Sequence, residues 1–120
     1  MLTTEEKTQA VVAALEDIKA NDITVIDTSK LSSMFERMII ASAQSTRQTR
    51  ALADNVVVKL KERGAQVFGR EGEESGEWIL IDLGEVLVHV MQPAIRDYYN
   101  LEELWSKAQA VRPKLAKTPA

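Results

Sequence analysis

The sequence has no cysteine in its 120 residues, which excludes a disulfide framework, a cysteine-ligated zinc site and thiol catalysis. It has a single histidine, too few for most histidine metal sites. No apolar run approaches the ~20 residues that a membrane-spanning helix needs. The beginning of the chain, MLTTEEKTQ, is polar and acidic, unlike a signal peptide. These absences are compatible with a reducing cytosol, and we expect a cytoplasmic protein.

What is present is the composition of an ordinary globular protein, with 45% hydrophobic and 28% charged residues. A chain of this length buries enough surface to fold as one unit. Residues 107–120 contain two prolines, four basic residues and no acid. Such a segment lacks the apolar content that packing requires. We therefore expect residues 1–106 to form a single domain and residues 107–120 to form a flexible basic tail.

Acidic residues are concentrated in the body of the chain. All 18 Asp and Glu residues lie before residue 106, together with 11 of the 15 Lys and Arg residues. Six of these acids fall within residues 71–85, a window without Lys or Arg. This charge pattern disfavours a nucleic-acid-binding surface and favours a basic partner. The alternative is that the acids only increase solubility.

Two apolar runs within Glu77–Met91 flank Leu83-Gly84, the pattern of a β-hairpin with a short turn. A two-residue turn places these residues opposite one another: Asp82 and Glu85, Ile81 and Val86, Leu80 and Leu87, Ile79 and Val88, Trp78 and His89. Because side chains alternate between the faces of a sheet, one face is wholly apolar and belongs in the core. It comprises Ile79, Ile81, Val86, Val88 and Val90. The other face is amphipathic and is the candidate functional face: Trp78, Leu80, Asp82, Glu85, Leu87, His89 and Met91.

Helical and strand patterns alternate through the rest of the chain. The pair Thr3 and Glu6 has capping-box spacing and opens a helix that extends toward Ala20. The patterns further predict strands at 23–28, 35–42 and 65–70, a long helix at 45–63 ended by Gly64, and short helices at 94–99 and 101–106. The order α-β-β-α-β-β-β predicts one α/β (α+β) domain, with a four- or five-stranded mixed sheet and two long helices on one face. Residues 35–70 have the pattern of a right-handed crossover between parallel strands.

Two groups on the hairpin could carry chemistry. Asp82 and Glu85, if opposed, repel each other, so a cation should compensate them. A basic side chain of a partner would serve, as would a metal ion, and a solvated surface is the remaining alternative. His89 is expected opposite Trp78, where a structural ring contact is favoured over a catalytic role because no nucleophile motif accompanies it.

Two further segments allow both a structural and a functional interpretation. The turn at 41–50, ASAQSTRQTR, leads into a helix and could attract an anion, but it has no glycine to wrap a phosphate. Helix capping by Ser42 or Ser45 explains its hydroxyls without a ligand. Near the other end, a group of large side chains most simply covers an edge of the core, or else widens the amphipathic face into a protein-binding patch. This group contains Arg96, Tyr98, Tyr99, Leu101, Leu104 and Trp105.

Several spaced motifs together resemble the ribosomal silencing factors, the Iojap-related family. They are VIDTS (25–29), MIIASAQSTRQTRALAD (38–54), the loop EGEESGEW (71–78), IDLGEVLVHVM (81–91) and YYNLEELW (98–105). The combination is specific, although no single piece of it is. The resemblance covers about Thr4–Trp105, nearly the whole chain that is expected to be ordered.

The resemblance implies a fold like that of nucleotidyltransferases, without their catalytic motif and without a cofactor. It further implies that the protein is not an enzyme and that it binds large-subunit ribosomal protein L-fourteen. Such binding sterically prevents the small subunit from joining, which represses translation when nutrients are limiting. The residues matched to the family's hairpin and ending, and the strand neighbour Met91, are the expected protein contacts: Trp78, Asp82, Glu85, His89, Met91 and Tyr99. A peripheral contact of the basic tail with ribosomal RNA and a homodimer off the ribosome are further associations to test.

Two sites depart from the family pattern, so no partner contact is assigned to them. Glu36-Arg37 stands where the family usually has an Asp before an apolar or aromatic residue, and Pro93-Ala94-Ile95 replaces a more acidic stretch. Two alternative functions stay open. One is a nucleotide-binding or nucleotidyltransferase-like enzyme, which would need two closely spaced strand carboxylates to hold Mg²⁺. The other is a large-subunit assembly factor that has no silencing role.

Overall fold

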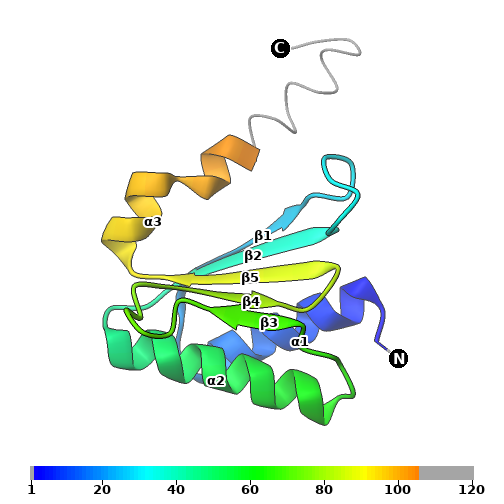
Figure 1. Cartoon of the computed structure of the whole chain (residues 1–120), viewed down its shortest axis with the longest axis horizontal. Coiled ribbons are helices and arrows are strands. Elements are labelled where there is room, and N and C mark those ends of the chain that lie inside the picture. The colour runs from blue at the N-terminus through cyan, green and yellow to red at the C-terminus, as the bar shows by residue number, and fades with distance from the viewer. Residues whose placement is uncertain (1, 106–120) are drawn as a thin grey trace.

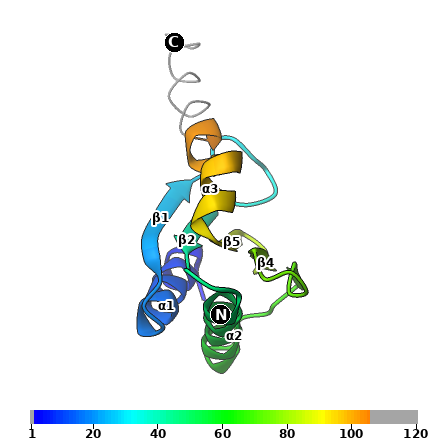
Figure 2. The same ribbon diagram turned by 90° about the vertical axis from the view of Figure 1, so that its left-hand side faces the viewer.

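The computed structural model describes residues 2–105, which form a five-stranded sheet with helices on both faces (Figures 1 and 2). Residues 101–105 add a helical turn after the last of the elements. In chain order the elements are α1 (Thr4–Asp17), β1 (Asn21–Asp27), β2 (Arg37–Ser42), α2 (Thr46–Glu62), β3 (Gly69–Glu71), β4 (Trp78–Asp82), β5 (Val86–Met91) and α3 (Pro93–Tyr99). The predicted α+β fold and its element order are confirmed. The predicted tail, residues 107–120, lies outside the described residues.

The two long helices begin where their capping residues predict. The Thr3 hydroxyl accepts a hydrogen bond from the Glu6 N–H at 3.1 Å, and the Glu6 carboxylate accepts one from the Thr3 N–H at 2.9 Å. At the start of α2 the Ser45 hydroxyl accepts from the Gln48 N–H at 3.1 Å. After α2, Gly64 has a φ of 88°, a backbone conformation that residues with a side chain rarely adopt, and the helix ends before it as predicted.

The strands lie in the order β1-β2-β5-β4-β3. β2 pairs with β5 in parallel, and every other neighbouring pair is antiparallel. The predicted crossover from β2 through α2 to β3 therefore does not join adjacent strands, because β5 and β4 lie between them. β3 is also shorter than the predicted strand at 65–70, since the backbone before it first closes the end of α2, with the Ala65 N–H donating to the Leu60 carbonyl at 2.9 Å.

The two faces of the sheet are covered unequally. α1 and α2 pack on one face and enclose the main core, to which the predicted β-branched side chains of β4 and β5 all belong (Figure 2). On the opposite face a smaller cluster forms where α3 and residues 101–105 lie across β1, β2 and β5 (Figures 1 and 2). It contains Ile26, Met38, Ile40 and Met91, with Phe35, Trp78, Ile95, Leu101 and Trp105 packed against them. We call this second face the outer sheet face and residues 93–105 the helical arm.

The register of the hairpin differs from the prediction by two residues. Asp82 lies opposite Leu87 and Trp78 opposite Met91, so the predicted pairs of Asp82 with Glu85 and of Trp78 with His89 were wrong. The turn keeps two residues but is Gly84-Glu85, one residue later than predicted, because the Leu83 N–H donates to the Val86 carbonyl at 2.9 Å. Within it the Asp82 carboxylate accepts from the Gly84 N–H at 2.8 Å. A shift of two keeps each strand side chain on its predicted face. None of the helices within residues 2–105 is long and apolar enough to cross a membrane.

Candidate protein-binding face

The outer sheet face stays partly open over β4 and part of β5, beside the helical arm. Here β4 and β5 present Trp78, Leu80, Asp82 and Leu87, all of intermediate exposure. His89 and Met91 point to the same face but are buried, at 7% and 0% exposure. Of the predicted contact residues, therefore, Trp78 and Asp82 are accessible on the sheet, while His89 and Met91 lie beneath the surface.

Trp78 lies at the centre of a row of aromatic rings. Its indole N–H donates to Nδ1 of His89 at 2.9 Å, and its ring centroid lies 4.9 Å from that of Tyr99. Tyr99 in turn makes an edge contact with Tyr98, with centroids 5.0 Å apart. Tyr98 is 80% exposed and Tyr99 51%. The row thus runs from a buried histidine to two exposed tyrosines and joins β4 to the helical arm.

His89 is held in its neutral form. Because Nδ1 accepts from Trp78, the proton of the neutral ring is on Nε2, an atom that is buried and has no hydrogen-bond partner in the described protein. Burial lowers the pKa of His89 from 6.5 to about 4. A histidine with this environment is a structural acceptor for Trp78 and does not titrate near neutral pH.

Glu85 does not share a site with Asp82. Its carboxylate forms an ion pair with Lys7 of α1 at 2.6 Å, and the same ammonium donates to the Leu83 carbonyl at 3.2 Å. The hydrogen bond from Lys7 lowers the pKa of Glu85. The cation expected to compensate this carboxylate thus comes from the chain itself. The sequence did contain a sign of this ion pair: Lys7 is four residues before the buried Val11, so it lies on the buried face of α1.

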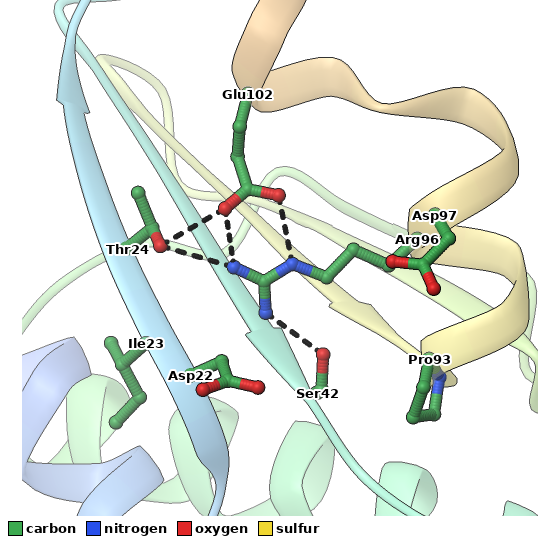
Figure 3. A pocket seen from close by; sticks show the side chains of 8 residues that line it. All are labelled: Asp22, Ile23, Thr24, Ser42, Pro93, Arg96, Asp97 and Glu102. Atoms are coloured by element: carbon green, nitrogen blue, oxygen red, sulfur yellow. Dashed lines mark hydrogen bonds and ion pairs between the residues drawn. The ribbon is translucent and has the colours of Figure 1, made fainter.

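A buried arginine holds the helical arm on the sheet (Figure 3). The Arg96 guanidinium donates to both oxygens of Glu102, at 2.9 and 2.6 Å, to the Ser42 hydroxyl at 2.8 Å and to the Thr24 hydroxyl at 3.0 Å. The hydrogen bond from Arg96 lowers the pKa of Glu102. This network anchors the C-terminal segment on the sheet, and the two strand hydroxyls are partners that the sequence did not reveal.

Beside this network lies a cavity of about 470 Å³, into which the carboxylates of Asp22 and Asp97 open (Figure 3). The Arg96 side chain in its wall already has partners on three residues. Among the described residues no group of three or more His, Cys, Asp or Glu side chains is placed to hold a metal ion. The cavity is therefore best explained as the gap left between β1 and the arm.

The turn into α2 uses its polar groups internally. Ser45 caps the helix, and Arg50 donates to the carbonyls of Glu73 and Glu74 at 2.9 and 2.6 Å. Gln48 donates to the carbonyls of Ile18 and Lys19, both at 3.3 Å. These contacts support helix capping and loop anchoring over an anion site.

A small pocket opens at the sheet edge, between β3 and β4. It has a volume of about 190 Å³ and is lined by Glu71, Gly72, Trp78 and Leu80. Glu71 lies opposite Leu80 in the register, so its side chain belongs to the outer sheet face. We call this opening the edge pocket. Sequence reasoning missed Glu71 as a site residue, because its face depends on the register of a three-residue strand.

The wall of the edge pocket depends on Gly72, and replacement by alanine is expected to lower the free energy of unfolding by about 2 kcal/mol. Gly72 has a φ of 90°, and an added Cβ would lie 2.0 Å from the Trp78 carbonyl oxygen. Urea unfolding measures the loss. Gly64→Ala is a matched control, because Gly64 has a similar φ of 88° but no atom within 4 Å of an added Cβ. Equal losses in both variants would show that the contact with Trp78 adds nothing.

Comparisons with known proteins agree on one family. The family model described as "ribosomal silencing factor during starvation" matches residues 2–120. A ribosomal silencing factor from Chromobacterium violaceum is 57% identical over 101 residues, which cover 84% of this chain and 83% of that protein. One from Bacillus subtilis is 38% identical, covering 80% of this chain and 81% of that protein. A mouse protein named for mitochondrial assembly of the ribosomal large subunit is 32% identical over 79% of this chain and 43% of its own length.

Solved structures show the same fold. A crystal structure of a protein from Chromobacterium violaceum matches with a TM-score of 0.86 and 55% identity, covering 88% of each chain. A crystal structure from Bacillus halodurans matches with a TM-score of 0.78 and 35% identity, covering 85% of this chain and 95% of that one.

Proposed function

This chain belongs to the ribosomal silencing factor family, and we propose on that basis that it binds the large ribosomal subunit through ribosomal protein L-fourteen. Bound there, it sterically prevents the small subunit from joining and so represses translation when nutrients are scarce. The observation that carries this proposal is the family match over residues 2–120, together with relatives that are named as silencing factors, which is a regulatory and not an enzymatic role.

The outer sheet face supports the proposal as a contact surface. A half-exposed tryptophan, Trp78, is fixed by His89 on one side and Tyr99 on the other, so it loses little freedom when a partner packs on it. Asp82 lies on the same face and suits a basic protein. In this proposal Trp78, Asp82 and Tyr99 touch the partner, His89 and Met91 support them from beneath, and Glu85 stabilises the hairpin end through Lys7.

The test is sedimentation with purified ribosomal subunits. The wild-type protein is expected to move with isolated large subunits in a sucrose gradient and to reduce the amount of joined ribosomes when small subunits are added. Asp82→Lys is expected to weaken both effects, because it reverses one charge on the proposed contact face. Glu16→Lys, an exposed position on α1, is the control for charge reversal itself. A wild-type protein that stays at the top of the gradient would contradict the proposal.

A second candidate function is favoured by one observation, the name of the mouse relative as a protein of large-subunit assembly. An assembly factor would act on maturing large subunits instead of mature ones. Cells lacking the protein would then accumulate incomplete large subunits during rapid growth. A silencing factor alone predicts normal subunits during growth and an excess of joined ribosomes during starvation, so gradient profiles of the two conditions separate the functions.

A further inference from the structure

We propose that the edge pocket receives one arginine or lysine side chain from the partner protein, an inference that rests on the proposed function and assigns the chemistry of one contact. The pocket is too small for a cofactor, at about 190 Å³ against the roughly 300–1,000 Å³ of small-molecule sites. Its volume suits a single long side chain. Its position at the sheet edge, beside the three-residue strand β3, leaves it open to an approaching surface.

The walls of the edge pocket match the two halves of a basic side chain. Trp78 and Leu80 supply an aromatic and an aliphatic surface, which can pack against the methylene stem of lysine or arginine. The indole face also attracts the cation itself. Glu71 brings a carboxylate to the same opening. An apolar occupant would instead cover that carboxylate without pairing it, which is costly.

The basic residue next in sequence is already used elsewhere. Arg70 lies opposite Ile81, so it points to the helix side of the sheet. There it forms ion pairs with Asp54 and Glu73, both at 2.6 Å. It therefore does not neutralise Glu71, whose side chain belongs to the other face. The surrounding loop, residues 71–77, has four glutamates and no basic residue. Arg70 pairs with one of them, Glu73, and the negative charge of the other three favours a cation at the pocket.

The same charges distinguish a protein partner from RNA. Phosphate groups would be repelled by Glu71 and its acidic loop, whereas a basic protein surface would be attracted. The loop is also held in place, because Thr49 donates to the Gly76 carbonyl at 2.6 Å and Arg50 to the carbonyls of Glu73 and Glu74. Because the walls of the pocket are already ordered, binding does not lose the conformational entropy of ordering them.

The experiment measures binding of the full chain to isolated large subunits. Glu71→Lys is expected to lower the affinity about tenfold, and Glu71→Gln by on the order of threefold, because the first places a like charge in the pocket and the second only removes a charge. Glu71→Gln should also weaken the dependence of binding on salt. Glu16→Lys is the control for Glu71→Lys: it makes the same change of charge on α1, which covers the other face of the sheet. Circular dichroism and thermal unfolding of each variant show that the fold is kept.

The outcomes separate this inference from the proposed function. Binding by the wild type with a loss confined to the Glu71 variants supports the pocket. Binding by the wild type that the Glu71 variants retain in full overturns the pocket and leaves the proposed function standing. Tighter binding by Glu71→Lys would indicate a phosphate or acidic group at this point and overturns the basic side chain. A wild type that does not bind large subunits overturns the proposed function.

Discussion

Arg96→Met is expected to lower the free energy of unfolding by about 3 kcal/mol and to loosen the helical arm. Methionine keeps much of the length of the side chain but removes all donors. Glu102, Ser42 and Thr24 then lose their shared partner, and the Glu102 carboxylate stays beside the sheet without its cation. The figure is at the low end for a broken buried pair, because the Glu102 side chain is 30% exposed and water can reach it.

Urea unfolding gives the loss, and hydrogen exchange shows where it acts. Exchange should rise first in residues 93–105 and much less in α1 and α2. Arg47→Met is the matched control, since Arg47 is exposed on α2. The double variant Arg96→Met with Glu102→Leu should recover part of the stability, because it removes the unpaired charge as well. An unchanged single variant would show that the apolar contacts of the arm hold it without the network.

The free energy of unfolding is expected to fall by about 3 kcal/mol between pH 6.5 and pH 4 through His89 alone. The pKa of His89 in the folded protein is lowered from 6.5 to about 4, so over this window the unfolded chain binds the proton that the folded chain rejects. The contribution is therefore complete above pH 6.5 and is lost as the pH falls toward 4. Protonation also places a hydrogen on Nδ1, which can then no longer accept from Trp78.

His89→Gln isolates this contribution. A glutamine carbonyl can accept from the indole of Trp78, yet it does not titrate. Carboxylates whose pKa is lowered in the fold, Glu85 and Glu102, lose their own contributions at the acid end in both proteins. The quantity to measure is thus the difference between wild type and variant in urea unfolding at several pH values. Parallel curves for the two proteins would show that folding does not lower the pKa of His89.

Local sequence signals predicted the local structure well. The capping pair at Thr3, the cap at Ser45 and the break at Gly64 set the helices, and the alternation in β4 and β5 set which side chains enter the core. The face assignment survived an error in the hairpin register, since a shift of two returns each side chain to the same face. The error arose because Leu83 is buried in the core and still pairs with Val86, so the two-residue turn is Gly84-Glu85 instead of Leu83-Gly84.

What the sequence could not predict depends on contacts between distant residues. Lys7 meets Glu85 and Arg96 meets Thr24 only because β1, β2 and β5 are adjacent in the sheet, and no local pattern encodes that order. The edge pocket is a similar case. Trp78 and Leu80 were on the predicted functional face, but Glu71 joined them only through the pairing of β3 with β4. The family resemblance predicted the fold, whereas the contact residues remain a prediction.

The position of β5 in the sheet has a consequence for synthesis of the protein. β5 lies between β2 and β4, yet it follows all the other strands in the chain. Until Val86–Met91 has left the ribosome, β2 and β4 each have an open edge with apolar side chains and no strand to pair with. The main core therefore closes late, and the nascent chain exposes aggregation-prone edges until then. The central strand of the sheet is thus the last strand to become available for pairing.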